Sequence, residues 1–176
     1  SWQALGPLVA KTEEPTIEEP PPKRPADALE GVPFVTAKAW CVGDPRSGKI
    51  SLGEEADTPR DIASTTKIMT AYLVLQLVER EPERLNERVT FSLNADQTIG
   101  STAGIRAGES ATVAEVLHGL MLPSGNDAAT ALSEHCGDWF PVDASAPEQT
   151  SAERFIAAMN DTAQQLGMTK SRYVNP

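Results

Sequence analysis

The sequence predicts a mixed α/β domain of the α+β kind, in which an antiparallel hairpin is followed by several helices. Residues 32–52 contain two runs rich in β-branched and aromatic side chains, separated by turn-forming residues at 43–48. Residues 64–166 then place apolar side chains at helical spacing between helix-starting and helix-stopping residues. Because a single hairpin is too small to be a stable sheet, we expect the antiparallel sheet to be incomplete in this chain.

The N-terminal 30 residues differ from the rest of the chain. The segment PTIEEPPPKRP at 15–25 has five prolines in eleven residues, a composition that favours extended backbone and cannot form a core. We interpret residues 1–30 as a Pro/Glu-rich tail or linker, either a spacer or an extension without a role, and residues 31–176 as the folded domain. The N-terminus has no basic head followed by an apolar signal segment, so the protein is cytosolic or its signal peptide is absent from this chain.

The expected elements follow in order after the hairpin of residues 32–52. Residues 64–80 form a helix that is apolar around much of its circumference, so we expect it to be deeply buried and to end before Pro82. Two capping-box patterns, Thr112 to Glu115 and Thr150 to Glu153, begin two further helices. Another helix runs from residue 125 or 126 to 134, and Gly167 ends the last one. Nothing after residue 52 predicts a long strand.

Composition excludes several classes of function. Fifteen Lys and Arg against 25 Asp and Glu give a formal net charge of −10, which argues against sequence-independent binding to nucleic acid. The adjacent His135 and Cys136 do not make a ligand set, so we expect no metal and no other cofactor. A disulfide between Cys41 and Cys136 stays open, because the sequence does not give the geometry that it needs.

The first chemical pattern is Ser64-x-x-Lys67 at a predicted helix start. Residues three apart lie side by side on a helix, so the Ser64 hydroxyl and the Lys67 amine come within hydrogen-bond reach. A lysine whose pKa is lowered by burial can remove the proton of a serine nucleophile. The helix N-terminus also offers free N–H groups for an oxyanion. The pattern also arises by chance as a surface serine and a solvated lysine, so it needs a second motif.

The second pattern is Ser124-Gly125-Asn126 at a turn between two predicted helices. Its structural alternative is helix capping, since serine, asparagine and aspartate are all good caps. Ser-x-x-Lys and Ser-x-Asn occur together, with a third motif Lys-Thr-Gly, in penicillin-binding proteins and class A β-lactamases.

The strings IASTTKIMTAYLVLQ at 62–76 and LMLPSGNDAATALSE at 120–134 resemble the serine-type D-Ala-D-Ala carboxypeptidases, the low-molecular-weight penicillin-binding proteins. The flanking segments at 100–122 and 155–176 and the hairpin at 42–50 are similar to that family too, so the resemblance covers about residues 32–176. It implies a penicillin-binding protein/β-lactamase-like fold with a helical subdomain and an antiparallel sheet.

The resemblance also implies a role for each motif residue. Ser64 would be the nucleophile that forms an acyl-enzyme, and its N–H would be half of the oxyanion hole. Lys67 would be the general base. Ser124 would relay a proton to the leaving amine, and Asn126 would bind the substrate's peptide group and orient Lys67. The substrate would be a peptidoglycan stem peptide ending in D-Ala-D-Ala, with β-lactams as covalent inhibitors, and the location extracytoplasmic, on the periplasmic or cell-wall side.

The family's third motif, Lys-Thr-Gly, is absent after Ser64. We therefore interpret residues 31–176 as the N-terminal part of a serine DD-peptidase domain. Its partner would be the missing C-terminal segment of the same domain, and we expect this chain alone to be inactive.

Four other functions stay open. A DD-endopeptidase would use the same site on peptidoglycan cross-links. A β-lactamase of class A would need an additional glutamate for deacylation, and no Glu-x-x-x-Asn follows Asn126. A non-catalytic penicillin-binding-protein-like fragment would explain the missing motif but not the intact ones. A Ser-His-Asp hydrolase is disfavoured because no Gly-x-Ser-x-Gly occurs.

Overall fold

The structure, a computed structural model, describes residues 35–176. The chain divides after Ala56 into two compact units. The predicted tail at 1–30 and the start of the predicted first strand lie outside the described residues.

The first unit contains the predicted hairpin. Strand β1 (Trp40–Gly43) pairs antiparallel with β2 (Ile50–Glu54), and the register shifts between Val42 and Gly43. Asp44 shapes the turn, because its carboxylate accepts hydrogen bonds from the Arg46 N–H at 2.9 Å and the Ser47 hydroxyl at 2.7 Å. The hairpin prediction is therefore confirmed, although β1 covers only the end of the predicted run 32–42 and β2 extends two residues beyond the predicted run 49–52.

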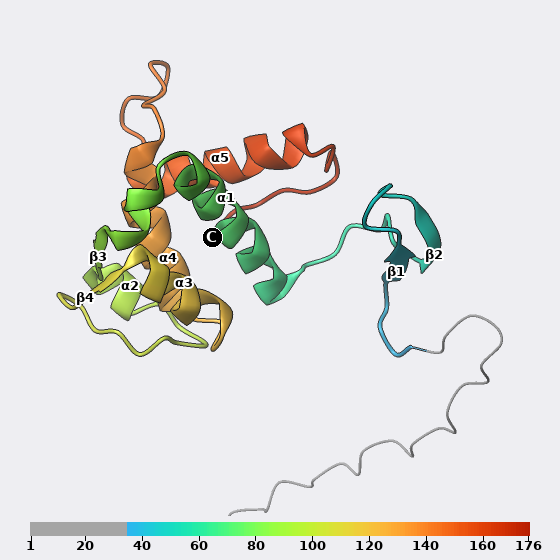
Figure 1. Cartoon of the computed structure of the whole chain (residues 1–176), viewed down its shortest axis with the longest axis horizontal. Helices are drawn as coiled ribbons and strands as arrows, with labels where there is room; N and C mark the ends of the chain where they lie inside the picture. Colours follow the sequence, from blue (N-terminus) through green and yellow to red (C-terminus); the bar gives the residue numbers. More distant parts are fainter. Residues whose placement is uncertain (1–34) are drawn as a thin grey trace, which may run out of the picture. The chain divides into compact units, whose positions relative to one another are not determined.

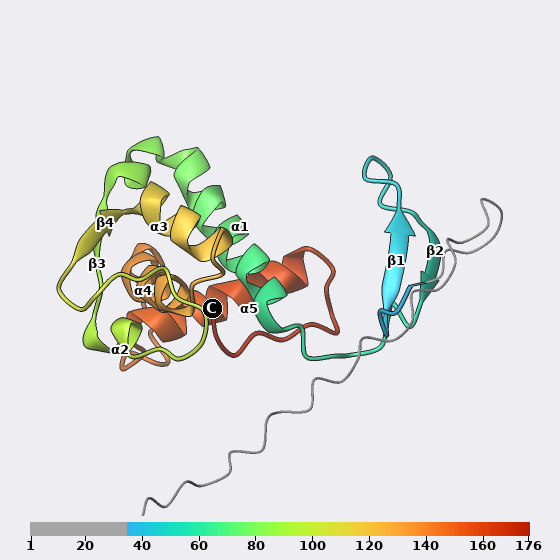
Figure 2. The same cartoon turned by 90° about the horizontal axis from the view of Figure 1, so that it is seen from below.

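The second unit, Asp57–Pro176, holds all the α-helices of the described chain, and Figures 1 and 2 show α4 in the middle of them. Helix α4 (Asn126–Cys136) packs against α5 (Ser151–Gln165), α3 (Val113–Met121) and the short α2 (Leu93–Asp96), and α1 (Thr66–Arg80) packs on α3, α4 and α5. The core between them is apolar. Its largest fully buried side chains are Phe91, Phe155, Leu120, Leu132 and Met159.

The predicted helix boundaries follow from local chemistry. Both capping boxes are present: Thr112 with Glu115 begins α3, and Thr150 with Glu153 begins α5. At the end of α5, Gly167 takes the left-handed conformation (φ 75°), and the Met168 N–H returns to the Ala163 carbonyl at 2.8 Å. This is the arrangement in which glycine satisfies the last carbonyls of a helix.

The expectation that α1 is deeply buried is right for one face of the helix and wrong for another. Ile68, Tyr72 and Leu75 keep 61%, 38% and 50% of their surface exposed, while Leu73 and Val74 are buried. The three exposed residues are spaced four and three apart, so they share one helix face. An apolar circumference shows which side chains favour burial, whereas actual burial depends on what packs against each face.

Several short elements were not predicted. Strands β3 (Arg88–Thr90) and β4 (Ser110–Thr112) form a small antiparallel pair, and 3₁₀ turns occur at Ala63–Thr65, Pro82–Asn86 and Gly137–Trp139. Three-residue strands are too short to produce a pattern of alternation. Because they join residues 20 or more apart in sequence, they close the stretch 91–109 into a loop beside α4.

The residues considered for metal binding have other partners. His135 Nε2 lies 3.0 Å from Glu87 Oε2, and the His135 ring packs edge-on against Trp139. Arg84 lies over the Trp139 ring, 4.5 Å from its centre. Cys136 is buried, which raises the pKa of its thiol, and both Cys41 and Cys136 are free. Within residues 35–176 no group of three or more metal-binding side chains comes together.

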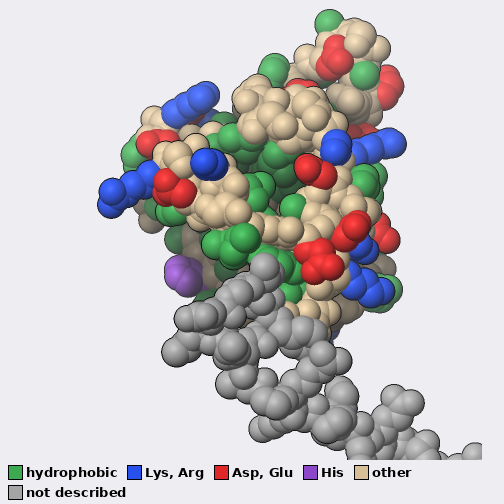
Figure 3. Space-filling model, turned by 90° about the vertical axis from the view of Figure 1, so that its right-hand side faces the viewer, with side chains coloured by type: hydrophobic (Ala, Val, Ile, Leu, Met, Phe, Trp, Pro, Cys, Tyr) green, Lys and Arg blue, Asp and Glu red, His purple; other side chains and the backbone are tan. Residues whose placement is uncertain are grey.

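Charges are dispersed on the surface. On the face shown in Figure 3, the acidic and basic side chains of the described residues are interspersed. No helix in the described part of the chain is long and apolar enough to cross a bilayer.

Candidate active site

The Ser-x-x-Lys motif lies where a 3₁₀ turn becomes α1. Ser64 is exposed in the turn Ala63–Thr65, and Lys67 is in the first turn of α1. The residue before Ser64 is strained, because Ala63 has a φ of 46°, a left-handed conformation that costs a non-glycine residue about 1–2 kcal/mol. The Thr65 N–H donates to the Ile62 carbonyl at 3.1 Å, whereas no hydrogen bond of the Ser64 N–H is found within residues 35–176, so the Ser64 N–H is available to a ligand.

Lys67 is the centre of the site. Only 6% of its surface is exposed, and burial lowers the pKa of its amine. Its Nζ donates to Ser64 Oγ at 3.3 Å and to Asn126 Oδ1 at 2.7 Å. A partly desolvated amine in contact with a serine hydroxyl has the arrangement required of a general base next to its nucleophile.

Asn126, the first residue of α4, is held in one orientation. Its Nδ2 donates to the Ile99 carbonyl at 2.7 Å, which leaves Oδ1 to accept from Lys67. Its backbone N–H donates to the Ser101 carbonyl, also at 2.7 Å. The loop 97–109 therefore fixes which end of the amide faces the lysine.

The glycine between Ser124 and Asn126 is required by close packing. A Cβ on Gly125 would lie 2.7 Å from Asp127 Oδ1 and 2.8 Å from the Gly119 carbonyl, closer than real Cβ contacts come. Gly100 is similar, since its φ is 106° and a Cβ there would lie 2.5 Å from Asn126 Nδ2. Neither glycine beside Asn126 therefore leaves room for a side chain.

Ser124 is positioned differently from the other motif residues. Its φ is 60°, so it is a second strained non-glycine residue at the site. It is partly buried and is not among the residues that line the cleft around Ser64, and no hydrogen bond of its hydroxyl is found within residues 35–176. The structure thus brings Ser64, Lys67 and Asn126 together and leaves Ser124 beside them without a direct bond.

A cleft of about 510 Å³ opens over these three residues. Sequence reasoning did not single out its outer walls, because they contain no motif. One wall is the face of α4 beyond Asn126 together with Thr98, whose hydroxyl lies 3.1 Å from that of Thr130. The other is the segment 172–176, which is held by Asn160: the Asn160 amide bonds both the N–H and the carbonyl of Tyr173, each at 2.9 Å.

The chain is similar to known proteins of one family. The family profile described as D-alanyl-D-alanine carboxypeptidase matches residues 27–176. The carboxypeptidase DacC of Escherichia coli K12 is 32% identical over 154 residues, which are 84% of this chain and 36% of that protein. The crystal structure of the carboxypeptidase DacD from Francisella tularensis superposes with a TM-score of 0.71 at 30% identity, covering 88% of this chain and 34% of that one.

Penicillin binding protein 5 from Haemophilus influenzae superposes with a TM-score of 0.70 at 27% identity, covering 84% of this chain and 40% of that one. The predicted fold class is therefore confirmed. The chain spans about a third of the length of the curated relatives that it matches.

Proposed function

The chain belongs to the D-alanyl-D-alanine carboxypeptidase family, and from this membership and the contacts of Lys67 we propose that the full-length protein is a serine DD-peptidase. The observation that carries the proposal is the position of Lys67 Nζ, between Ser64 Oγ and Asn126 Oδ1 at the base of an open cleft. The proposed substrate is a peptidoglycan stem peptide ending in D-Ala-D-Ala, which places the reaction outside the cytoplasm.

In the proposed acylation step, Lys67 accepts the Ser64 proton while Ser64 Oγ attacks the carbonyl carbon between the two D-alanines. The C–N bond then breaks, the proton passes to the leaving amine, and the peptide stays attached to Ser64 as an ester. Water attacks this ester and releases the shortened peptide and Ser64. The distance of 3.3 Å between Lys67 Nζ and Ser64 Oγ supports direct proton transfer.

Two other groups have proposed roles in the same step. The Ser64 N–H, in the first turn of the 3₁₀ segment, would stabilise the oxyanion of the tetrahedral intermediate. Ser124 would carry the proton from Lys67 to the leaving amine. Its hydroxyl has no partner among residues 35–176, so it is available for such a relay once substrate enters.

We further propose that more of the same domain covers the exposed face of α1. Ile68, Tyr72 and Leu75 form an apolar stripe there, and the relatives are two to three times longer than this chain. The strand carrying Lys-Thr-Gly, absent here, would contribute the second oxyanion donor and the positive charge for the substrate carboxylate. Loss of one oxyanion donor typically costs about a hundredfold or more in rate, so the described residues alone would be nearly inactive.

Penicillin labelling of the full-length protein tests the proposal, because a β-lactam carbonyl replaces the scissile amide and leaves a stable ester. We expect a mass adduct on the peptide that contains Ser64, and no adduct in Ser64→Ala. Ser124→Ala serves as the matched serine control, since it should slow labelling but keep the adduct on Ser64. An adduct on another residue, or normal labelling of Ser64→Ala, would refute the assignment.

A further inference from the structure

The residue after Asn126 is a buried carboxylate that the proposed mechanism does not use. Asp127 lies in the first turn of α4 and is only 2% exposed. Burying a charge is costly unless hydrogen bonds compensate for the lost water. The partners of Asp127 therefore indicate what its charge stabilises.

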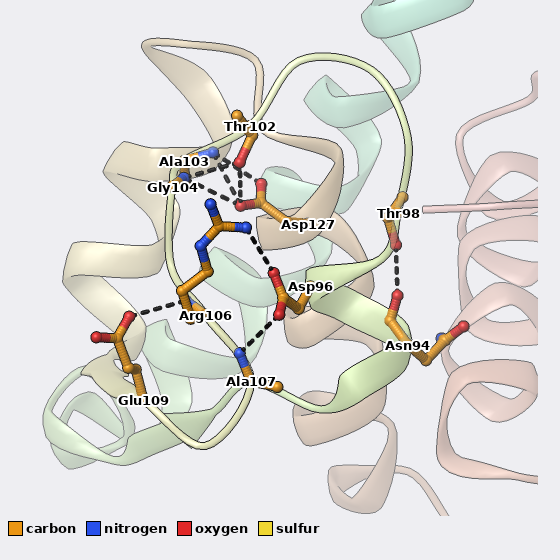
Figure 4. Close-up of polar contacts among 10 residues, drawn as sticks. All are labelled: Asn94, Asp96, Thr98, Thr102, Ala103, Gly104, Arg106, Ala107, Glu109 and Asp127. Atoms are coloured by element: carbon orange, nitrogen blue, oxygen red, sulfur yellow. Dashed lines mark hydrogen bonds and ion pairs between the residues drawn. The ribbon is translucent and has the colours of Figure 1, made fainter.

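All but one of those partners come from the loop 97–109 (Figure 4). Asp127 Oδ2 accepts from the Thr102 hydroxyl at 2.7 Å and from the Gly104 N–H at 3.2 Å. The Ala103 N–H reaches both carboxylate oxygens, at 2.8 and 3.0 Å. The fourth partner is the Ala128 N–H, 2.8 Å from Oδ1. Burial by itself raises the pKa of Asp127, but these hydrogen bonds outweigh it, so the pKa lies below its usual value.

The same stretch of loop also holds Asn126. The carbonyls of Ile99 and Ser101 accept from the Asn126 side chain and backbone, each at 2.7 Å, and the N–H groups of residues 103 and 104 donate to Asp127. Two consecutive residues of α4 thus bind five of the six loop residues 99–104: Asn126 donates to two carbonyls, and Asp127 accepts from two N–H groups and one hydroxyl. The Ile99 carbonyl, which accepts from the Asn126 side-chain amide, thus belongs to the same short loop segment that Asp127 binds.

We propose that Asp127 is a positioning residue that acts through the loop 99–104 to keep Asn126 Oδ1 directed at Lys67. This inference rests on the proposed function. Asp127 binds only one end of the loop, and a second carboxylate, that of Asp96, binds the other end. Asp96 accepts from Arg106 Nη1 and from the Ala107 N–H, both at 3.2 Å (Figure 4). The hydrogen bonds of the Asn126 side chain and N–H within residues 35–176 go to Lys67, Ile99 and Ser101 and to neither Arg106 nor Ala107.

Asp96 therefore provides a matched control. In Asp127→Asn, either orientation of the new amide faces its NH₂ toward N–H donors, so the loop loses bonds without a change in side-chain size. In Asp96→Asn the same chemical change, made at the end of α2, removes bonds to the other end of the same loop. Thr102→Val removes a single hydroxyl that donates to Asp127 and is the milder variant, which decides the question if Asp127→Asn does not fold.

The experiment combines two measurements on the full-length protein. The first is the ¹⁵N-resolved NMR signal of the Asn126 side-chain amide, whose hydrogen exchange reports its bond to the Ile99 carbonyl. The second is the second-order rate constant of acylation by a penicillin, corrected for the folded fraction. We expect Asp127→Asn to lose the exchange protection of the Asn126 amide and about tenfold or more of the rate. Thr102→Val should show smaller losses of both, and Asp96→Asn should show neither.

Two results would overturn the proposal. The first is an Asn126 amide that keeps its signal and protection in Asp127→Asn, or in Thr102→Val if only that variant folds. The second is an equal loss in Asp96→Asn, which would mean that any loosening of the loop has the same effect. If the wild-type protein is not acylated at all, the proposed function fails, and the Asn126 amide signal still decides whether Asp127 orients it.

Discussion

Replacing Asn126 by leucine should lower the pKa of Lys67 further. Leucine matches asparagine in shape but has no acceptor, so Lys67 Nζ loses its 2.7 Å bond to Oδ1 and keeps Ser64 Oγ. A hydrogen bond to a charged group contributes about 1.5–3 kcal/mol and one between neutral groups about 0.5–1.5 kcal/mol. The charged form of Lys67 therefore loses about 1–1.5 kcal/mol more than the neutral form, which corresponds to about one pKa unit.

The leucine side chain acts in the same direction, because it reduces the solvation of the amine and burial already lowers the Lys67 pKa. The other charged residues of the cleft, Arg60, Asp61 and Arg172, are unchanged in the variant, so their effect on Lys67 cancels in the comparison.

The assay is an NMR pH titration of the full-length protein labelled with ¹³C at the lysine ε-carbon. Lys67→Arg identifies the Lys67 signal by removing it. We expect the wild-type signal to titrate below the roughly 10.4 of a free lysine and the Asn126→Leu signal to titrate about one unit lower still. An unchanged or raised pKa in Asn126→Leu would refute the reasoning, since it would mean that the Asn126 amide presents its nitrogen to Lys67.

Three further predictions concern Gly125, the cap of α3 and Asp127. Gly125→Ala should lower the free energy of unfolding by about 1–3 kcal/mol and slow penicillin labelling, because the new Cβ would lie 2.7 Å from Asp127 Oδ1. An unchanged free energy of unfolding together with an unchanged labelling rate would contradict this. Thr112→Ala should lower the free energy of unfolding by about 1 kcal/mol through loss of the α3 cap without changing labelling, as measured by urea unfolding. The stability that Asp127 contributes should be fully present above its unfolded-state pKa of about 3.9 and should be lost as the pH falls through its lower folded-state pKa. The melting temperatures of wild type and Asp127→Asn should therefore converge in acid. A difference between them that widens below about pH 4 would contradict this prediction.

The sequence predicts this structure well where the determining interactions are local. The boxes at Thr112 and Thr150 and the glycine at 167 act on their own helix ends, so a few neighbouring residues suffice to place them. The exposed face of α1 could not be predicted in this way, because burial depends on residues elsewhere in the chain. The prediction failed at Ile68 and Leu75, which are apolar and exposed.

The candidate site depends both on local interactions and on contacts between residues far apart in the sequence. The closeness of Ser64 and Lys67 follows from helical spacing, whereas Lys67 and Asn126 are 59 residues apart and were connected only by the family resemblance. In the sequence, Asp127 is an aspartate at a predicted helix start, a pattern that indicates only a helix cap. Its contact with residues 102–104 could not be predicted, since that loop has no periodicity and its bonds are to backbone N–H groups, which every sequence contains.

Strain and burial are concentrated at the proposed catalytic residues. Within residues 35–176, three non-glycine residues have a positive φ, and two of them are Ala63, directly before Ser64, and Ser124. Lys67 adds the cost of a buried amine. Each of these features opposes folding, so other interactions must offset them. The core around α4 and the well-capped helices α3 and α5 do this, and they are the elements that position Asn126 and the cleft walls. Backbone hydrogen bonds hold both strained stretches, because the Thr65 N–H donates to the Ile62 carbonyl at 3.1 Å and the Gly125 N–H to the Gly119 carbonyl at 3.0 Å. The two serines therefore occupy their positions before substrate arrives, which is the condition that a preorganised active site requires.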